Sequence, residues 1–248
     1  MNLKRFIFWS VALLVSLIQC KATDYAILSD KAQNFYERRE WASVLAMCEL
    51  MLEQQPTIAT SYGRAITASI CVNDTMAQVR LFAGSMQNQV PFDTVFDAVK
   101  REALLLGKTE IYEQFMLSVK SRYEWLERTV NANLLDYYAF RNDGNRMVEY
   151  SLIMLERMPD NEKFMHLLAQ GYMLQAVQNK AISTYEKILD NNPDDYDALL
   201  ALGNYYAMQW DKDNAENVRK KAVVYLLRAY EISPTPYIES VMKRLQAK

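Results

Sequence analysis

The 248-residue sequence contains one histidine, His166, and only three cysteines. A single histidine excludes metal sites built from several histidine ligands. The chain also has no Cys-x-x-Cys pair and no glycine pattern of the Walker or dinucleotide-binding type. We therefore predict no metal site, no bound cofactor and no catalytic residues, and we expect the protein not to be an enzyme.

Glycine and proline are also scarce, with six of each. The residues that take their place include many Leu, Ala, Met, Glu, Lys and Gln, whose side chains lose little freedom in a helix. No strand-like alternation stands out, and a hydrophobic content of 51% is ample for a core. The composition therefore predicts an all-α fold.

Long runs of one charge are absent. The densest basic stretches, Arg38-Arg39 and residues 219–221, are short and have acidic neighbours, which argues against a nucleic-acid partner. Acidic pairs such as Asp194-Asp195 stand where helices are expected to begin, so we interpret them as helix caps and solubilising groups. An unrecognised carboxylate-based hydrolase remains an alternative function.

The amino terminus has the pattern of a secretory signal. Lys4 and Arg5 precede thirteen mostly apolar residues, 6–18, and small residues surround a cleavage point after Ala22. The apolar run is shorter than the roughly 18 to 20 residues that span a bilayer. We therefore predict that residues 1–22 are a signal peptide, that residues 23–248 form the mature domain, and that the protein is exported to the periplasm or cell envelope.

The three cysteines leave two questions open. Cys20 follows Leu17-Ile18-Gln19, which has the outline of a lipoprotein signal, so lipidation at Cys20 is the alternative to cleavage after Ala22 and would add a membrane anchor. Cys48 and Cys71 survive either cleavage, and they are either buried thiols or one disulfide. The oligomeric state is not determined by the sequence.

A helical repeat pattern is clearest between Glu162 and Asp195. Apolar and small residues recur there on two amphipathic helices, followed by a proline: Leu168, Ala169, Tyr172, Ala181, Tyr185, Ile188, Leu189 and Pro193. This pattern resembles the tetratricopeptide repeat (TPR), in particular that of exported bacterial proteins of the Bacteroidetes type. The resemblance implies a right-handed α-solenoid that binds another protein.

The prolines extend this period along the chain. Pro56, Pro91, Pro159, Pro193 and Pro234 are separated by 35, 68, 34 and 41 residues, which gives a period of about 34. We therefore expect about six TPR-like helix pairs and a capping helix: residues 25–58, 59–92, 93–127, 128–161, 162–195, 196–236 and 237–248. The clearest are 128–161, 162–195 and 196–236.

Two stretches depart from the pattern. Residues 59–127 match poorly, and we interpret them as divergent repeats, with another kind of antiparallel helix pair as the alternative. Residues 209–221 form a polar insertion, which we expect in an exposed loop or at helix ends, outside the packed seam.

In the family, the first helices of successive repeats line an inner binding surface. The resemblance nominates seven partner-binding residues at these positions: Asp136, Phe140, His166, Gln170, Met173, Asn204 and Met208. Some relatives use Lys and Asn at such positions to hold a terminal carboxylate, whereas this chain has Asp136 and Gln170. A Met-containing, partly polar surface is better suited to an amphipathic helix or an extended apolar segment.

The predicted function is a non-enzymatic exported scaffold that binds a protein or peptide partner in the cell envelope and assembles a complex. The alternatives are a glycan-binding surface lipoprotein and the carboxylate-based hydrolase named above. The identity of the partner is not encoded in any motif.

Overall fold

The computed structural model describes residues 24–246, all of whose regular structure is helical. The predicted signal peptide, with Cys20 and the cleavage point after Ala22, lies outside the described residues. The chain divides into two compact units, one ending at Leu126 and the other beginning at Glu127. They are called unit 1 and unit 2 below, and each is described by itself.

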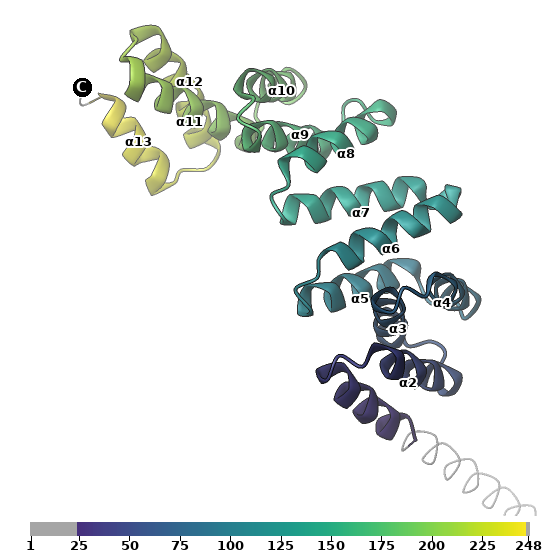
Figure 1. The fold of residues 1–248 in the computed structure, drawn as a ribbon. Coiled ribbons are helices and arrows are strands. Elements are labelled where there is room, and N and C mark those ends of the chain that lie inside the picture. The colour runs from purple at the N-terminus through teal and green to yellow at the C-terminus, as the bar shows by residue number, and fades with distance from the viewer. Residues whose placement is uncertain (1–23, 247–248) are drawn as a thin grey trace, which may run out of the picture. The chain divides into compact units, whose positions relative to one another are not determined.

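Unit 1 consists of helices joined by short turns (Figure 1). Its elements are a first helix over residues 24–37, α2 (Trp41–Gln54), α3 (Ala59–Cys71), α4 (Thr75–Gln87), α5 (Phe92–Leu105), α6 (Glu110–Arg122) and the 3-10 turn η1 (Glu124–Leu126). The helices α3 and α4 lie at a steep angle to α5 and α6 (Figure 1).

The helix α3 is the centre of unit 1, because it packs against α2, α4, α5 and α6. It is buried on every side, and its buried residues are mostly small: Ser61, Tyr62, Gly63, Ala65, Ile66, Thr67, Ala68 and Ser69. Small side chains let α5 approach closely, so that a Cβ added to Gly63 would lie 2.5 Å from the Cβ of Ala98. An amphipathic helix with one buried face could not occupy this place.

The interior of unit 1 also contains an ion pair. Arg64 Nε lies 3.4 Å from Glu102 Oε1, and Glu102 is only 2% exposed. The guanidinium of Arg64 also lies over the ring of Tyr36, 5.0 Å from its centre. Burial and the nearby carboxylate of Glu102 raise the pKa of Tyr36 to about 12.

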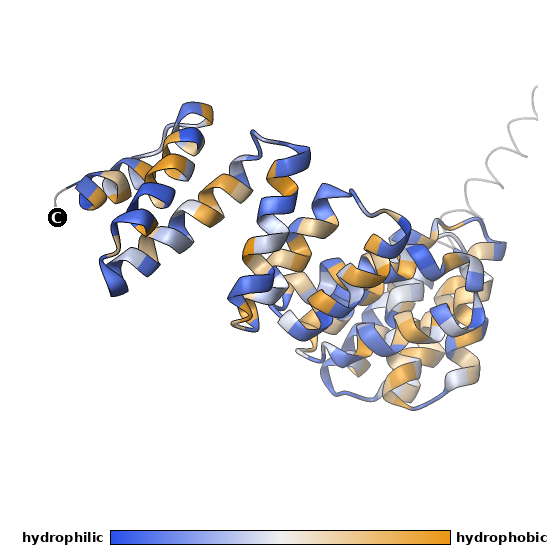
Figure 2. Cartoon of the chain, turned by 90° about the horizontal axis from the view of Figure 1, so that it is seen from above, coloured by the Kyte–Doolittle hydropathy of each residue, from blue (hydrophilic) through white to orange (hydrophobic). Residues whose placement is uncertain are grey.

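Unit 2 contains the better-matched repeats. Its helices are α7 (Glu127–Phe140), α8 (Gly144–Arg157), α9 (Glu162–Leu174), α10 (Gln178–Asn191), α11 (Tyr196–Asp213), α12 (Glu216–Ile232) and α13 (Pro236–Gln246). Each helix packs mainly on the one before it and the one after it, and polar and apolar residues lie on different faces of the helices (Figure 2). The all-α helical repeat fold predicted from the sequence is therefore confirmed.

Small residues stand where the helices of unit 2 cross. Ala169 and Ala181 are fully buried, on α9 and α10. A Cβ on Gly203 of α11 would come within 2.7 Å of Leu226 on α12. These contacts explain why small residues recur at the crossing positions of the sequence pattern.

One backbone feature repeats through both units. The turns inside successive helix pairs each contain a residue with positive φ: Arg39, Asn73, Gly107, Asn142, Ala176 and Asn214. The first five are 34, 34, 35 and 34 residues apart, and the last follows after 38. The turn conformation therefore keeps the repeat period through residues 59–127, where the side-chain pattern is poor.

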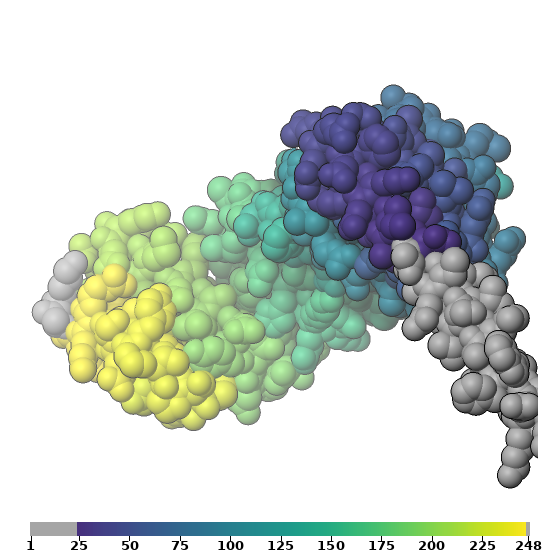
Figure 3. Space-filling model, turned by 90° about the horizontal axis from the view of Figure 1, so that it is seen from below, coloured from purple at the N-terminus to yellow at the C-terminus, as the bar shows by residue number. Residues whose placement is uncertain are grey.

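The insertion lengthens two helices, since α11 has 18 residues and α12 has 17, whereas α9 and α10 have 13 and 14. Most of it is exposed, but Trp210 is buried in the core between α11, α12 and α13. The expectation that the insertion stays outside the packed seam is wrong at this residue. The helix α13 covers the last pair through Ile238, Val241 and Leu245 (Figure 3).

Candidate functional site

The seven predicted partner-binding residues all belong to unit 2. They lie on its three first helices: Asp136 and Phe140 on α7, His166, Gln170 and Met173 on α9, and Asn204 and Met208 on α11. Side-chain caps fix where two of these helices begin. The amide of Phe164 donates to Asn161 Oδ1 (3.2 Å), and the amide of Ala198 donates to Asp195 Oδ1 (2.8 Å).

Asp136 joins α7 to α9. Its carboxylate accepts a hydrogen bond from Lys163, with Nζ 2.7 Å from Oδ1. Both side chains are exposed to solvent, so the pair contributes little stability.

His166 joins α9 to the beginning of α11. His166 Nε2 lies 3.0 Å from Asp195 Oδ2, and both side chains are largely buried. Asp195 therefore caps α11 and contacts the only histidine with the same carboxylate. Behind them, burial together with Asp197 and Asp195 raises the pKa of Tyr185 to about 12.

Asn204 joins α11 to α13. The hydroxyl of Tyr237 donates to Asn204 Oδ1 at 3.0 Å. Asp136, His166 and Asn204 thus each contact a residue near the beginning of a later helix, so that each first helix is tied to the next element of unit 2. Three of the seven predicted residues already have partners within the chain, while Gln170 is exposed on α9.

The three predicted apolar residues project into solvent. Phe140 is 64% exposed, Met173 42% and Met208 60%. Phe140 is the last residue of α7 and Met173 the second last of α9, whereas α11 continues beyond Met208 to Asp213. We call these three residues the apolar row.

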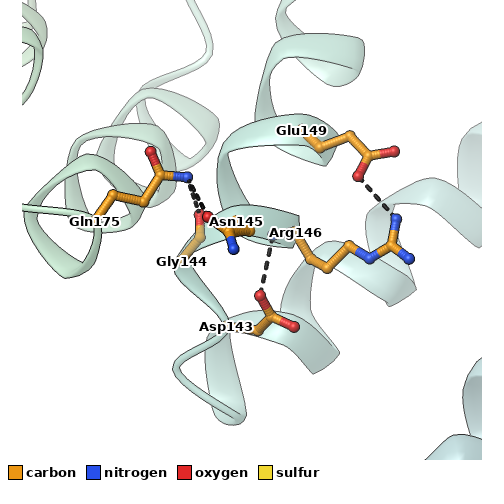
Figure 4. A network of polar contacts seen from close by, with 6 residues as sticks. All are labelled: Asp143, Gly144, Asn145, Arg146, Glu149 and Gln175. Carbon is orange, nitrogen blue, oxygen red and sulfur yellow. Dashed lines mark hydrogen bonds and ion pairs between the residues drawn. The ribbon is translucent and has the colours of Figure 1, made fainter. Parts of the chain in front are cut away.

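The turn after Phe140 is fixed against the end of α9 (Figure 4). The side-chain Nε2 of Gln175 donates to the carbonyl of Gly144 (3.2 Å) and to Asn145 Oδ1 (3.0 Å). The backbone approaches so closely that a Cβ on Gly144 would lie 2.7 Å from Leu174 Cβ. The end of α9, which carries Met173, is therefore held against the beginning of α8, four residues after Phe140.

A groove with a volume of about 270 Å³ opens beside Met208, between α11 and α13. It is lined by Asn204, Ala207, Met208, Tyr237, Ser240, Val241 and Arg244. The sequence predicted Asn204 and Met208, but it treated the residues of α13 only as a cap. The signal that could have found Tyr237 is its position 33 residues after Asn204, about one repeat later.

Within residues 24–246, no three His, Cys, Asp or Glu side chains come together as a metal site, and no helix is both long and apolar enough to cross a membrane. Cys48 and Cys71 are free thiols and do not form a disulfide with each other in the structure. Burial raises the pKa of Cys48 to about 12.

Comparisons with known proteins gave matches in structure only. No protein-family model matches the sequence, and no curated protein matches it. Among solved structures, the chain is similar to a chain of the APC/C hetero-tetramer Cut9–Hcn1, with 10% identity and a TM-score of 0.47. That match covers 91% of this chain and 46% of the other, so this chain spans less than half of its length.

Two bacterial structures are also similar. One is the C-terminal part of a TPR repeat-containing protein from Cytophaga hutchinsonii (15% identity, TM-score 0.48), with 81% of this chain and 77% of that chain covered. The other is a tetratricopeptide repeat protein from Parabacteroides merdae (12% identity, TM-score 0.46), with 90% and 84% covered. Both proteins are described as TPR proteins, which is the repeat that the sequence resembles.

Proposed function

We propose that this protein is a non-enzymatic, exported TPR-like scaffold that binds a protein or peptide partner in the cell envelope and assembles a complex there. The observation that carries the proposal is the apolar row of unit 2. Phe140, Met173 and Met208 are large apolar side chains that stand in solvent at successive first helices. Their burial against a partner would gain free energy that folding leaves unused.

The size of this gain indicates how many contacts a partner needs. Each large apolar side chain that a partner covers contributes roughly 1.5 to 3 kcal/mol before the ordering costs of association. Several such contacts are needed to offset these costs. A single substitution in the apolar row should therefore be tolerated, whereas three together should abolish binding.

The test compares two triple variants with the wild type. The first replaces Phe140, Met173 and Met208 by Ser. The matched control replaces three exposed apolar residues of α12 by Ser: Val224, Leu227 and Ile232. Circular dichroism first establishes that both variants fold, and capture from the native envelope fraction is then analysed by mass spectrometry.

We expect the apolar-row variant to lose the partner that the wild type and the α12 variant both retain. Loss of the partner by the α12 variant alone would show that the partner docks on second helices. Capture that is unchanged in both variants would contradict the proposal.

Export is part of the same proposal and has its own measurement. Cleavage after Ala22 gives a mature chain that begins at Thr23, which the intact mass of protein purified from the native cell reports directly. A chain that begins at Cys20 with added acyl mass would instead place the protein on a membrane as a lipoprotein. A chain that retains Met1 would contradict both routes.

A further inference from the structure

The groove between α11 and α13 has an apolar interior. Its floor consists of Ala207 and Val241, which are buried in the core of the last helix pair. Its walls are Met208 and Tyr237, which are both more than half exposed. The walls come from two different helices, so a side chain that enters between them would be in contact on both sides.

The polar groups at the rim already have partners. The hydroxyl of Tyr237 donates to Asn204 Oδ1 (3.0 Å), and Ser240 Oγ donates to the carbonyl of Tyr237 (2.7 Å). Arg244 Nη1 lies 3.3 Å from Asp211 Oδ2, which balances its charge. A charged ligand would therefore find no unbalanced opposite charge at the rim, and it would have to compete with Asp211 for Arg244.

Asn204 differs from the other rim residues. Its oxygen accepts from Tyr237, which fixes the orientation of the amide and leaves the Nδ2 hydrogens as donors. A donor at the edge of an apolar groove is suited to a main-chain carbonyl, because a peptide offers one next to every side chain.

From this lining we infer that the α11–α13 groove binds an uncharged apolar side chain of a protein partner, with an adjacent main-chain carbonyl accepting a hydrogen bond from Asn204 Nδ2. The inference rests on the proposed function and makes it specific. The helix α13 then covers the core and also forms one wall of a recognition site. The occupant of the groove is an apolar residue without a neighbouring carboxylate.

The experiment uses residues 23–248 as bait and a phage-displayed library of random dodecapeptides as the probe. The enriched peptides are synthesised with a fluorescein label, and their affinity is measured by anisotropy. We expect them to share an uncharged apolar anchor, such as Leu, Met or Phe. Anchors that are Asp, Glu, Lys or Arg would overturn the inference, and so would a failure to enrich any peptide.

Variants then locate the binding. Ser240→Trp places a large ring at the rim of the groove and leaves the apolar row intact, and it should weaken binding at least about tenfold. The matched control is Lys243→Trp on the same helix, where the side chain is exposed and does not line the groove; it should stay within about twofold of the wild type. Asn204→Ala should weaken binding by about three- to tenfold, which corresponds to one lost hydrogen bond.

The failure of this inference can be told apart from the failure of the proposed function. Peptide binding that Ser240→Trp leaves unchanged, but that Phe140→Ser with Met173→Ser weakens, would overturn the groove and support the apolar row. If Ser240→Trp blocks the peptides while Phe140→Ser with Met173→Ser leaves their binding unchanged, the groove stands and the rest of the apolar row is wrong.

Discussion

The two units use one repeat period for two kinds of packing. In unit 1, α3 contacts four other helices and is buried all round, and the unit encloses an ion pair between Arg64 and Glu102. In unit 2 each helix packs on its neighbours in the chain, and two of the three polar contacts made by the first helices, Asp136–Lys163 and Asn204–Tyr237, are exposed. A common repeat length therefore does not fix how the helices are layered.

The difference explains why the family pattern is weak in unit 1. The usual large apolar and aromatic residues of a first helix suit an element with one buried face. A helix enclosed by four others needs small residues instead, which α3 supplies with Ser61, Gly63 and Ala65. The poor match of residues 59–71 thus reflects the denser packing of α3.

The largest expected effect breaks the buried ion pair. Arg64→Met leaves the carboxylate of Glu102 without its cation in the interior of unit 1, which should cost about 3 to 5 kcal/mol. The matched change in unit 2 is Lys163→Met, whose partner Asp136 is exposed, and it should cost less than about 1 kcal/mol. Native-state hydrogen exchange of α3 and α9 measures both. Equal losses of unfolding free energy in the two variants would show that water reaches the Glu102 carboxylate despite the packing around it.

The next effect concerns the close approach of α3 and α5. A Cβ at Gly63 would lie 2.5 Å from Ala98 Cβ and 2.8 Å from its carbonyl carbon, so Gly63→Ala should force the helices apart and cost about 1 to 3 kcal/mol.

The control is Gly84→Ala in α4, where the nearest atom, on the ring of Tyr62, is 3.9 Å from the new Cβ. It should gain about 0.5 to 1 kcal/mol, because alanine is the better helix former. Thermal melting of both variants decides the point, and a stabilised Gly63→Ala protein would show that α5 is free to move away.

The smallest effect is a difference in alkaline stability. Burial raises the pKa of Cys48 in unit 1 from 9.0 to about 12, so the folded state retains a proton that the unfolded chain loses. The stability from this thiol is fully present below pH 9 and falls as the pH rises toward 12, and by about pH 10 the loss should reach about 1.4 kcal/mol. In unit 2, Tyr185 has its pKa raised from 10.0 to about 12, so its contribution begins to fall only above pH 10.

Denaturant unfolding of the wild type and of Cys48→Ala, between about pH 8 and about pH 10, tests whether the loss of stability above pH 9 comes from Cys48. The wild type should lose stability above pH 9, and the variant should lose less over the same range. Parallel pH profiles for the two proteins would contradict the assignment to Cys48.

The sequence predicts the helices well because their signals are local. Apolar spacing and prolines indicate each helix pair, and the all-α repeat fold follows from them. The turns were less visible, since Arg39 and Ala176 adopt positive φ although neither residue type favours it. Nor could the central place of α3 be predicted, because it depends on where α5 and α6 pack.

The candidate site was predictable in position but not in contacts. Repeat spacing put Asp136, His166 and Asn204 on first helices, as the structure has them. It could not show that each is already bonded, because the bonding residues lie 27, 29 and 33 residues further along the chain. The binding role of all seven residues stays a prediction.

The enclosed position of α3 has a mechanical consequence. If the chain were pulled from its carboxyl end, unit 2 could yield one helix pair at a time, because each pair is held mainly by its neighbours. In unit 1, withdrawing α3 would expose its contacts with four helices at once. Under force, unit 1 should therefore unfold in a single step, whereas unit 2 should unfold gradually, one helix pair after another.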